Sequence, residues 1–190
     1  DELDSSDTAT FTVNYTVSDN DNATASSTLT LTVSGENDAA VARADAETTD
    51  ENTSVSVDVL ANDTDVDGDD SPANFTIDSI DSVSVGGITF ANPETLFSIV
   101  GNEIAFTPGT ALDVMDSSDT ANFTVNYTMS DDENSGSSAA LTLTVNGLND
   151  TPVANDDSPY TTDENTPIDI DVLVNDTDVD GDDNSSNFSI

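Results

Sequence analysis

The sequence predicts an all-β protein, an antiparallel Greek-key β-sandwich that occurs in tandem repeats. Three observations support this prediction. Short runs alternate apolar and polar residues with a period of two, turn-forming residues separate these runs, and long segments of sequence recur at a fixed distance. Runs of Ala, Leu, Lys and Glu at helical spacing are missing, so we expect no helix of ordinary length.

The repeat is identified from matching segments. Residues 11–16 and 123–128 both read Phe-Thr-Val-Asn-Tyr-Thr, at an offset of 112, whereas the Thr-Asp-Glu-Asn-Thr of residues 49–53 recurs at an offset of 113 because one residue is inserted near Pro159. We therefore interpret residues 1–37 as the C-terminal part of a truncated repeat, 38–150 as one complete β-sandwich repeat and 151–190 as the N-terminal part of another truncated repeat.

Strand candidates follow one another along each repeat. Thr, Val, Ile and Phe suit a pleated surface, and they alternate with polar residues in runs separated by turns such as Gly86-Gly87 and Pro108-Gly109. The candidate runs are residues 11–17, 29–33, 55–59, 75–80, 82–85, 88–90, 96–100 and 103–106. About seven short strands in ~110 residues favour a two-sheet sandwich of immunoglobulin or cadherin type, and a closed barrel is the weaker alternative.

Charge and composition exclude several functions. The chain of 190 residues has 40 Asp plus Glu against one basic residue, Arg43, and a formal net charge of −39. Binding to nucleic acid or to anionic lipid needs clustered Lys and Arg, so we expect no nucleic-acid partner. No run approaches the ~18 apolar residues of a membrane span, so we expect no direct membrane insertion. Without Cys or His, the available metal ligands are oxygen atoms.

One acidic loop has the spacing of a cation-binding loop. Carboxylates stand at Asp63, Asp65, Asp67 and Asp69 around Gly68, which permits a sharp turn, and the same pattern recurs at Asp176, Asp178, Asp180 and Asp182. The twelfth position of a helical calcium loop holds Asn74 instead of Glu, so the helix-loop-helix interpretation fails. The remaining ligands must come from elsewhere in the fold.

Two further polar groups are candidates for those ligands. They are Asn37-Asp38 at the end of a repeat, with the copy Asn149-Asp150, and Glu51 before a predicted strand, with the copy Glu164. We expect these groups to meet the acidic loop at one end of the sandwich. Carboxylate and amide oxygens in such number favour Ca²⁺ over Mg²⁺, which requires stricter octahedral geometry. The alternative is a salt-adapted acidic surface-layer domain without specific calcium sites.

The segments 148–157, 163–167 and 171–182 resemble the cadherin-like, bacterial immunoglobulin-like tandem repeats of large secreted adhesins, including biofilm and RTX-type adhesins. The resemblance implies an extracellular, cell-surface spacer that supports adhesion. Its partners would be neighbouring repeats of the same chain and calcium ions, and the adhesion target stays unknown. The implied ligands are Asn37, Asp38, Glu51, Asp63, Asp65, Asp67, Asn149, Asp150, Glu164, Asp176, Asp178 and Asp180, with Asp69 and Asp182 in addition. Residues 20–23 and 132–135 differ from the Gly-rich loop of that family.

Other functions are less well supported by the sequence. Paired carboxylates act in glycosidases, but nothing in the sequence marks the concave site that such chemistry needs, so we expect no enzyme activity. A ligand- or carbohydrate-binding accessory module of a secreted protein remains the alternative. Such modules use exposed aromatic residues, and the chain has no Trp, with Tyr160 as the one free candidate.

Overall fold

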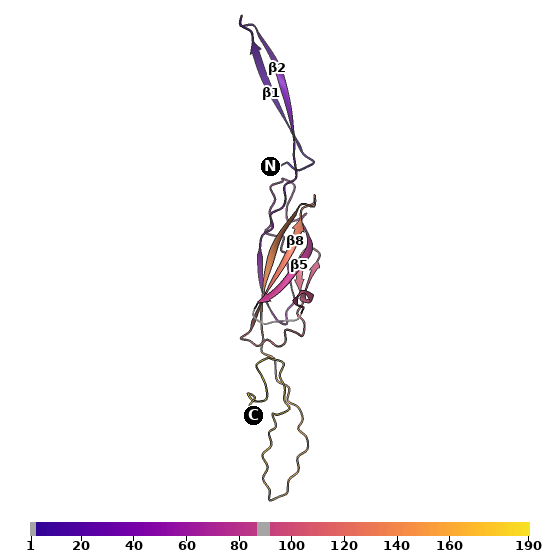
Figure 1. Cartoon of the computed structure of the whole chain (residues 1–190), viewed down its shortest axis with the longest axis vertical. Helices are drawn as coiled ribbons and strands as arrows, with labels where there is room; N and C mark the ends of the chain where they lie inside the picture. Colours follow the sequence, from indigo (N-terminus) through magenta and orange to yellow (C-terminus); the bar gives the residue numbers. More distant parts are fainter. Residues whose placement is uncertain (1–2, 87–91) are drawn as a thin grey trace. The chain divides into compact units, whose positions relative to one another are not determined.

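The computed structural model describes residues 3–86 and 92–190, and the described chain is all-β (Figure 1). Its one helical element there is a short 3₁₀ turn, η1, at Pro93–Leu96. The strand predicted at residues 88–90 lies outside the described residues. Within the described part of the chain, no helix is long and apolar enough to span a membrane.

Two strands precede residue 38, and seven lie among the described residues between 38 and 150. The strands are β1 (Thr8–Ser18), β2 (Thr24–Ser34), β3 (Asp45–Asp50), β4 (Val55–Val57), β5 (Thr76–Gly86), β6 (Phe97–Val100), β7 (Glu103–Phe106), β8 (Thr120–Ser130) and β9 (Gly136–Asn146). The predicted run 103–106 is confirmed as β7. The runs predicted at 75–80 and 82–85 form one continuous strand, β5, because no turn interrupts them.

The seven strands form two sheets, as the immunoglobulin-like sandwich requires. One has the order β3-β9-β8-β5 and the other the order β4-β7-β6, and Figure 1 shows β5 beside β8. The predicted β-sandwich of immunoglobulin type is confirmed. One strand pair in it is parallel, because β3 pairs with β9 with Asp45 opposite Leu141. A strand that enters a repeat and a strand that leaves it can run in the same direction along the sheet edge, and no hairpin joins them.

Contacts divide the described chain into two compact units. The first contains residues 3–43, 59–79 and 127–139, and the second contains residues 44–58, 80–86, 92–126 and 140–190. In the second unit three aromatic rings join strands of the two sheets. The ring of Phe97 lies 5.3 Å from that of Phe106 and 5.5 Å from that of Phe123. All three side chains are buried, so this cluster holds the sheets face to face.

The core of the first unit is centred on Tyr127. Its ring is fully buried, and its hydroxyl donates to the carbonyl oxygen of Val59 at 3.1 Å. The same hydroxyl lies 3.3 Å from the carbonyl oxygen of Arg43. Leu60 and Phe75 are buried in the same unit. Tyr127 of β8 therefore holds Val59, and with it the segment that leads into the acidic loop at Asp63.

The hairpin β1–β2 has nearly the sequence of β8–β9 but a different environment. Phe11 and Tyr15 were predicted to face a core, yet they are 54% and 47% exposed, whereas their copies Phe123 and Tyr127 are 0% exposed. Within the described residues, β1 and β2 form a sheet of two strands by themselves. The alternation of apolar residues is therefore present in the hairpin without the sheet that would cover it.

Candidate metal centre

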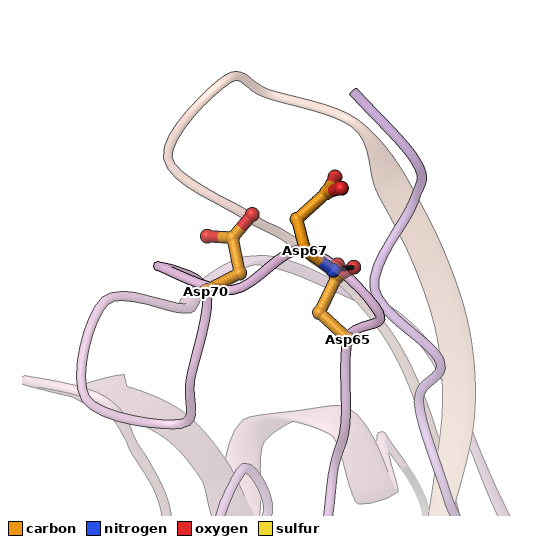
Figure 2. Close-up of side chains that lie close together, drawn as sticks. All are labelled: Asp65, Asp67 and Asp70. Carbon is orange, nitrogen blue, oxygen red and sulfur yellow. Dashed lines mark hydrogen bonds between the residues drawn. The ribbon is translucent and has the colours of Figure 1, made fainter. Parts of the chain in front are cut away.

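Three carboxylates of one loop lie together in the first unit. Asp65, Asp67 and Asp70 each place an oxygen within 4.8 Å of an oxygen of the other two, and we call them the loop cluster. Figure 2 shows their carboxyl groups on the same side of the loop. The turn at residues 67–70 is closed by the Asp70 amide, which donates to the Asp67 carbonyl oxygen at 3.3 Å. This turn brings Asp70 back toward Asp65.

The loop is fixed to the chain before it by backbone contacts. Val41 and Thr64 form an isolated antiparallel bridge, and the Arg43 amide donates to Asp63 Oδ1 at 2.7 Å. Asp65 Oδ1 accepts from the Asp67 amide at 3.0 Å. One oxygen of Asp65 therefore shapes the loop, which leaves its second oxygen directed at the cluster.

The linker and the β8–β9 turn reach the same place. The Asp38 amide donates to Asp67 Oδ2 at 2.8 Å, and Asn37 Nδ2 donates to Asp131 Oδ2 at 3.3 Å. Asp131 is buried, and its other oxygen accepts from the Ser135 amide at 2.7 Å. Three segments that are far apart in sequence are therefore joined by hydrogen bonds around the acidic loop.

Several of these oxygens are buried without a donor. Asp67 is only 3% exposed, and its Oδ1 has no hydrogen-bond partner among the described residues. The same holds, within residues 3–86 and 92–190, for Asn37 Oδ1, Asp65 Oδ2 and Asp70 Oδ2. A buried carboxylate oxygen without a donor is costly, and a bound cation is one way to compensate that cost.

Burial and shared hydrogen bonds change the acidity of the neighbouring carboxyl groups. Burial, followed by the adjacent carboxyl of Asp132, raises the pKa of Asp70 to about 6. A hydrogen bond shared with Asp132, followed by burial, raises the pKa of Glu133 to about 7. The same shared bond lowers the pKa of Asp132 itself. These three groups also place oxygens within 4.8 Å of one another, so the cluster continues onto the β8–β9 turn.

The second unit contains a copy of the loop cluster. Asp178, Asp180 and Asp183 meet the same 4.8 Å limit, and the Asp150 amide donates to Asp180 Oδ2 at 3.0 Å. Asp180 is 3% exposed, and its Oδ1 has no partner in the part of the chain that the structure describes. Burial raises the pKa of Asp180 against the opposing effect of the Asp150 amide.

Glu51 belongs to this second group. It is 1% exposed, its Oε1 accepts from the Leu148 amide at 3.0 Å, and its Oε2 lacks a partner among the described atoms. Burial raises the pKa of Glu51, and the charges of Asp150 and Asp180 add to that increase. The expectation that Glu51 meets the loop of its own repeat was wrong. Glu51 instead contacts Leu148, in the linker after β9, because β3 pairs with β9 and ends beside it.

The remaining predicted ligands have other surroundings. Asp63 and Asp176 each accept a backbone amide from the segment that follows the acidic linker, from Arg43 at 2.7 Å and from Asn155 at 2.8 Å. Asp69 and Asp182 are exposed and interact with the carboxyls of Asp4 and Asp116. Asn149 donates to the Asp150 carbonyl oxygen, and Glu164 is exposed.

Sequence reasoning missed five members of these groups, namely Asp70, Asp131, Asp132, Glu133 and Asp183. Asp70 and Asp183 take the place that the spacing gave to Asp69 and Asp182, because the turn after Gly68 advances the chain by one residue more than strict alternation. Asp131 was also missed. Its position directly after the alternating strand β8 was the available signal, since strand ends carry loops to the pole of a sandwich.

Comparison with protein families gives one match. The model described as Bacterial Ig domain matches residues 37–145 and again residues 149–189. Comparison with curated proteins gives no match. The two matched segments begin where the two acidic linkers, Asn37-Asp38 and Asn149-Asp150, stand in the sequence.

Proposed function

The chain belongs to the bacterial Ig domain family, and from this premise we propose that it is an extracellular spacer of an adhesin whose repeat junctions bind calcium and stiffen when they do. The observation that carries the proposal is the set of buried carboxylate oxygens at Glu51, Asp67 and Asp180 for which the described residues provide no donor. General acidity would place such groups in solvent, where water satisfies them.

The donor set fits calcium. We call the linker Asn37-Asp38 with the loop cluster the first junction. It offers carboxylate or amide oxygens of Asn37, Asp65, Asp67, Asp70 and Asp131. Calcium accepts six to eight oxygens in irregular geometry, and carboxylates from flexible loops supply that number more readily than the octahedron that magnesium requires. Copper, nickel and zinc prefer nitrogen or sulfur, and the sequence has neither His nor Cys.

We expect calcium to stiffen the junction because the ligands come from two successive sequence repeats. Glu51 lies in the sequence repeat 38–150, whereas Asp180 lies in the following segment, and the linker residue Asp150 stands between them. Calcium held by all three would neutralise carboxylates that otherwise repel one another across the junction. Repulsion at that place favours transient opening of the junction, so the cation-bound junction is the more rigid one.

The size of the effect follows from mass action. A ligand that binds only the folded state adds about 2.7 kcal/mol of stability at one hundred times its dissociation constant. Extracellular calcium modules bind at roughly 10⁻⁴ to 10⁻³ M. We therefore expect calcium in the millimolar range to raise the melting temperature of the 190-residue chain.

Calorimetric titration of calcium into the whole chain tests the proposal. We expect saturable binding that weakens at least about tenfold when Asp67→Asn and Asp180→Asn are combined. The matched control removes the same charge from two exposed positions outside the clusters, Asp21→Asn with Asp169→Asn, and should bind like the natural chain. A weak, non-saturable signal that depends only on total charge would replace the proposal with a diffuse, salt-adapted acidic surface.

A further inference from the structure

We propose that residues 113–119, called here the junction loop, form a docking surface for the acidic loop of the next repeat, and that this contact is made by protein atoms alone. The partner that it fits is a second copy of the same repeat, represented here by residues 176–183. The inference goes beyond the proposed function and does not depend on calcium. Two contacts and the recurrence of the first one support it.

The first contact holds the linker. The Gly147 amide donates to the Asp119 carbonyl oxygen at 3.1 Å. A Cβ atom at position 147 would stand 2.1 Å from the Asp116 carbonyl oxygen and 2.9 Å from Met115 Cβ. No side chain fits at that distance from backbone, so only glycine lets the linker leave β9 in contact with the junction loop.

The second contact holds the next repeat. The Gly181 amide donates to the Val114 carbonyl oxygen at 2.9 Å, and a Cβ at Gly181 would meet the same oxygen at 3.1 Å. Gly181 follows Asp180 directly, so this hydrogen bond ties the loop that carries the second acidic cluster to the preceding repeat. The bond involves backbone atoms only, so carboxylate repulsion does not remove its donor or acceptor.

The junction loop is anchored in the core of its own repeat. Leu112 and Met115 are fully buried, and the Met115 amide donates to the Leu112 carbonyl oxygen at 3.0 Å. Asp116 Oδ1 accepts from the Ser118 amide at 2.6 Å, and the Asp119 amide donates to the Asp116 carbonyl oxygen at 2.9 Å. The docking surface is therefore part of the folded repeat before the next repeat meets it.

The third observation is that the linker contact occurs twice. Gly35 and Asp7 stand 112 residues before Gly147 and Asp119. The Gly35 amide donates to the Asp7 carbonyl oxygen at 3.0 Å. A Cβ at Gly35 would stand 2.1 Å from the Asp4 carbonyl oxygen, and Asp4 Oδ1 accepts from the Ser6 amide at 2.6 Å. The same glycine conflict in a second copy indicates a built contact and not a chance approach.

Amide hydrogen exchange of the whole chain in excess chelator tests the inference. In the natural chain we expect the Gly181 amide to exchange at least about tenfold more slowly than an unstructured glycine. Gly147→Ala should abolish that protection, because its methyl group displaces the junction loop. The control is Gly136→Ala, whose Cβ would lie 3.6 Å from the Met129 carbonyl oxygen, an ordinary contact, and should leave protection unchanged.

Protected amides of Val125 and Leu143 verify in each variant that the core is folded. Gly181→Ala is a second variant, and it changes nothing inside residues 38–150. An unprotected Gly181 amide in the natural chain with a folded core overturns the inference, and so does protection that survives Gly147→Ala. Protection that persists in a chain with no saturable calcium binding supports this inference and contradicts the proposed function, so the two failures are distinguishable.

Discussion

At the scale of single residues, the unusual feature is a carboxylate buried without a donor. Glu51 and Asp180 are nearly inaccessible, and each carries one oxygen without a partner among the described residues, in a chain with a net charge of −39. Removing a charge from water costs several kcal/mol even after the protein relaxes, unless an opposite charge lies close. Glu51 and Asp180 both belong to the second unit, and Arg43, the single basic residue of the sequence, belongs to the first.

Glu51→Gln should therefore have opposite effects with and without calcium. In chelator we expect an unchanged or higher melting temperature, because the amide removes a buried charge and keeps an acceptor for the Leu148 amide. In calcium we expect binding at least about tenfold weaker, because a carboxylate ligand is lost. Differential scanning calorimetry in both conditions measures this, with the exposed Glu103→Gln as control. A large destabilisation in chelator would show that the charge of Glu51 is stabilising by itself.

The calcium-free chain should lose stability as the pH rises from about 5 to 8. The folded-state pKa values of about 6 for Asp70 and about 7 for Glu133 lie above the usual 3.8 and 4.5, so the folded chain binds more protons in this range. The groups that face them are Asp65, Asp131 and Asp132, all acidic. The lowered pKa of Asp132 acts below this range.

Urea denaturation in chelator at both pH values measures this dependence. Glu133→Gln should flatten it, because one of the two raised groups is then removed. A stability that rises with pH in the natural chain contradicts the prediction.

At the scale of elements, one hairpin sequence occurs in two environments. In β8 the hydroxyl of Tyr127 donates to the Val59 carbonyl oxygen, whereas its copy Tyr15 in β1 is half exposed. The difference arises from the strands around each hairpin and not from the hairpin itself. The same strand sequence thus stabilises the fold in one place and contributes little in the other.

Tyr127→Phe should destabilise the fold by about 1 to 3 kcal/mol, because it leaves a buried carbonyl oxygen without its donor. Tyr15→Phe makes the same chemical change at the matching position of β1 and should alter stability by less than about 0.5 kcal/mol. Chemical denaturation of the two variants under identical conditions gives the comparison. Equal effects would show that the buried hydroxyl is not part of what holds the fold.

Sequence pattern predicted the elements whose signal is local. The alternation of β8 and the short run of β7 correspond to strands in the structure. The strand β3 was missed because its residues, Asp45–Asp50, contain no apolar alternation, and its conformation depends on pairing with β9. Asp65 and Asp67 could be predicted from their spacing in one loop. The place of Glu51 could not, because it depends on which junction β3 approaches.

At the scale of the whole molecule, the net charge limits how compact the chain can be. A net charge of −39 on 190 residues opposes compact arrangements, and salt screens exposed charges within about 10 Å at 0.1 M. The specific cation binding that we propose differs from screening because it requires particular oxygens at the junctions. Calcium should consequently change the chain at concentrations where an equal ionic strength of sodium chloride does not.

Small-angle X-ray scattering of the 190-residue chain tests this central claim most directly. Profiles would be recorded in chelator, in millimolar calcium, and in sodium chloride of matched ionic strength. We predict a larger maximum dimension and a narrower distribution of conformations in calcium only, because calcium held at a junction restricts the linker there. Identical profiles in calcium and chelator, or the same change in sodium chloride, would contradict the claim that calcium stiffens the repeat junctions.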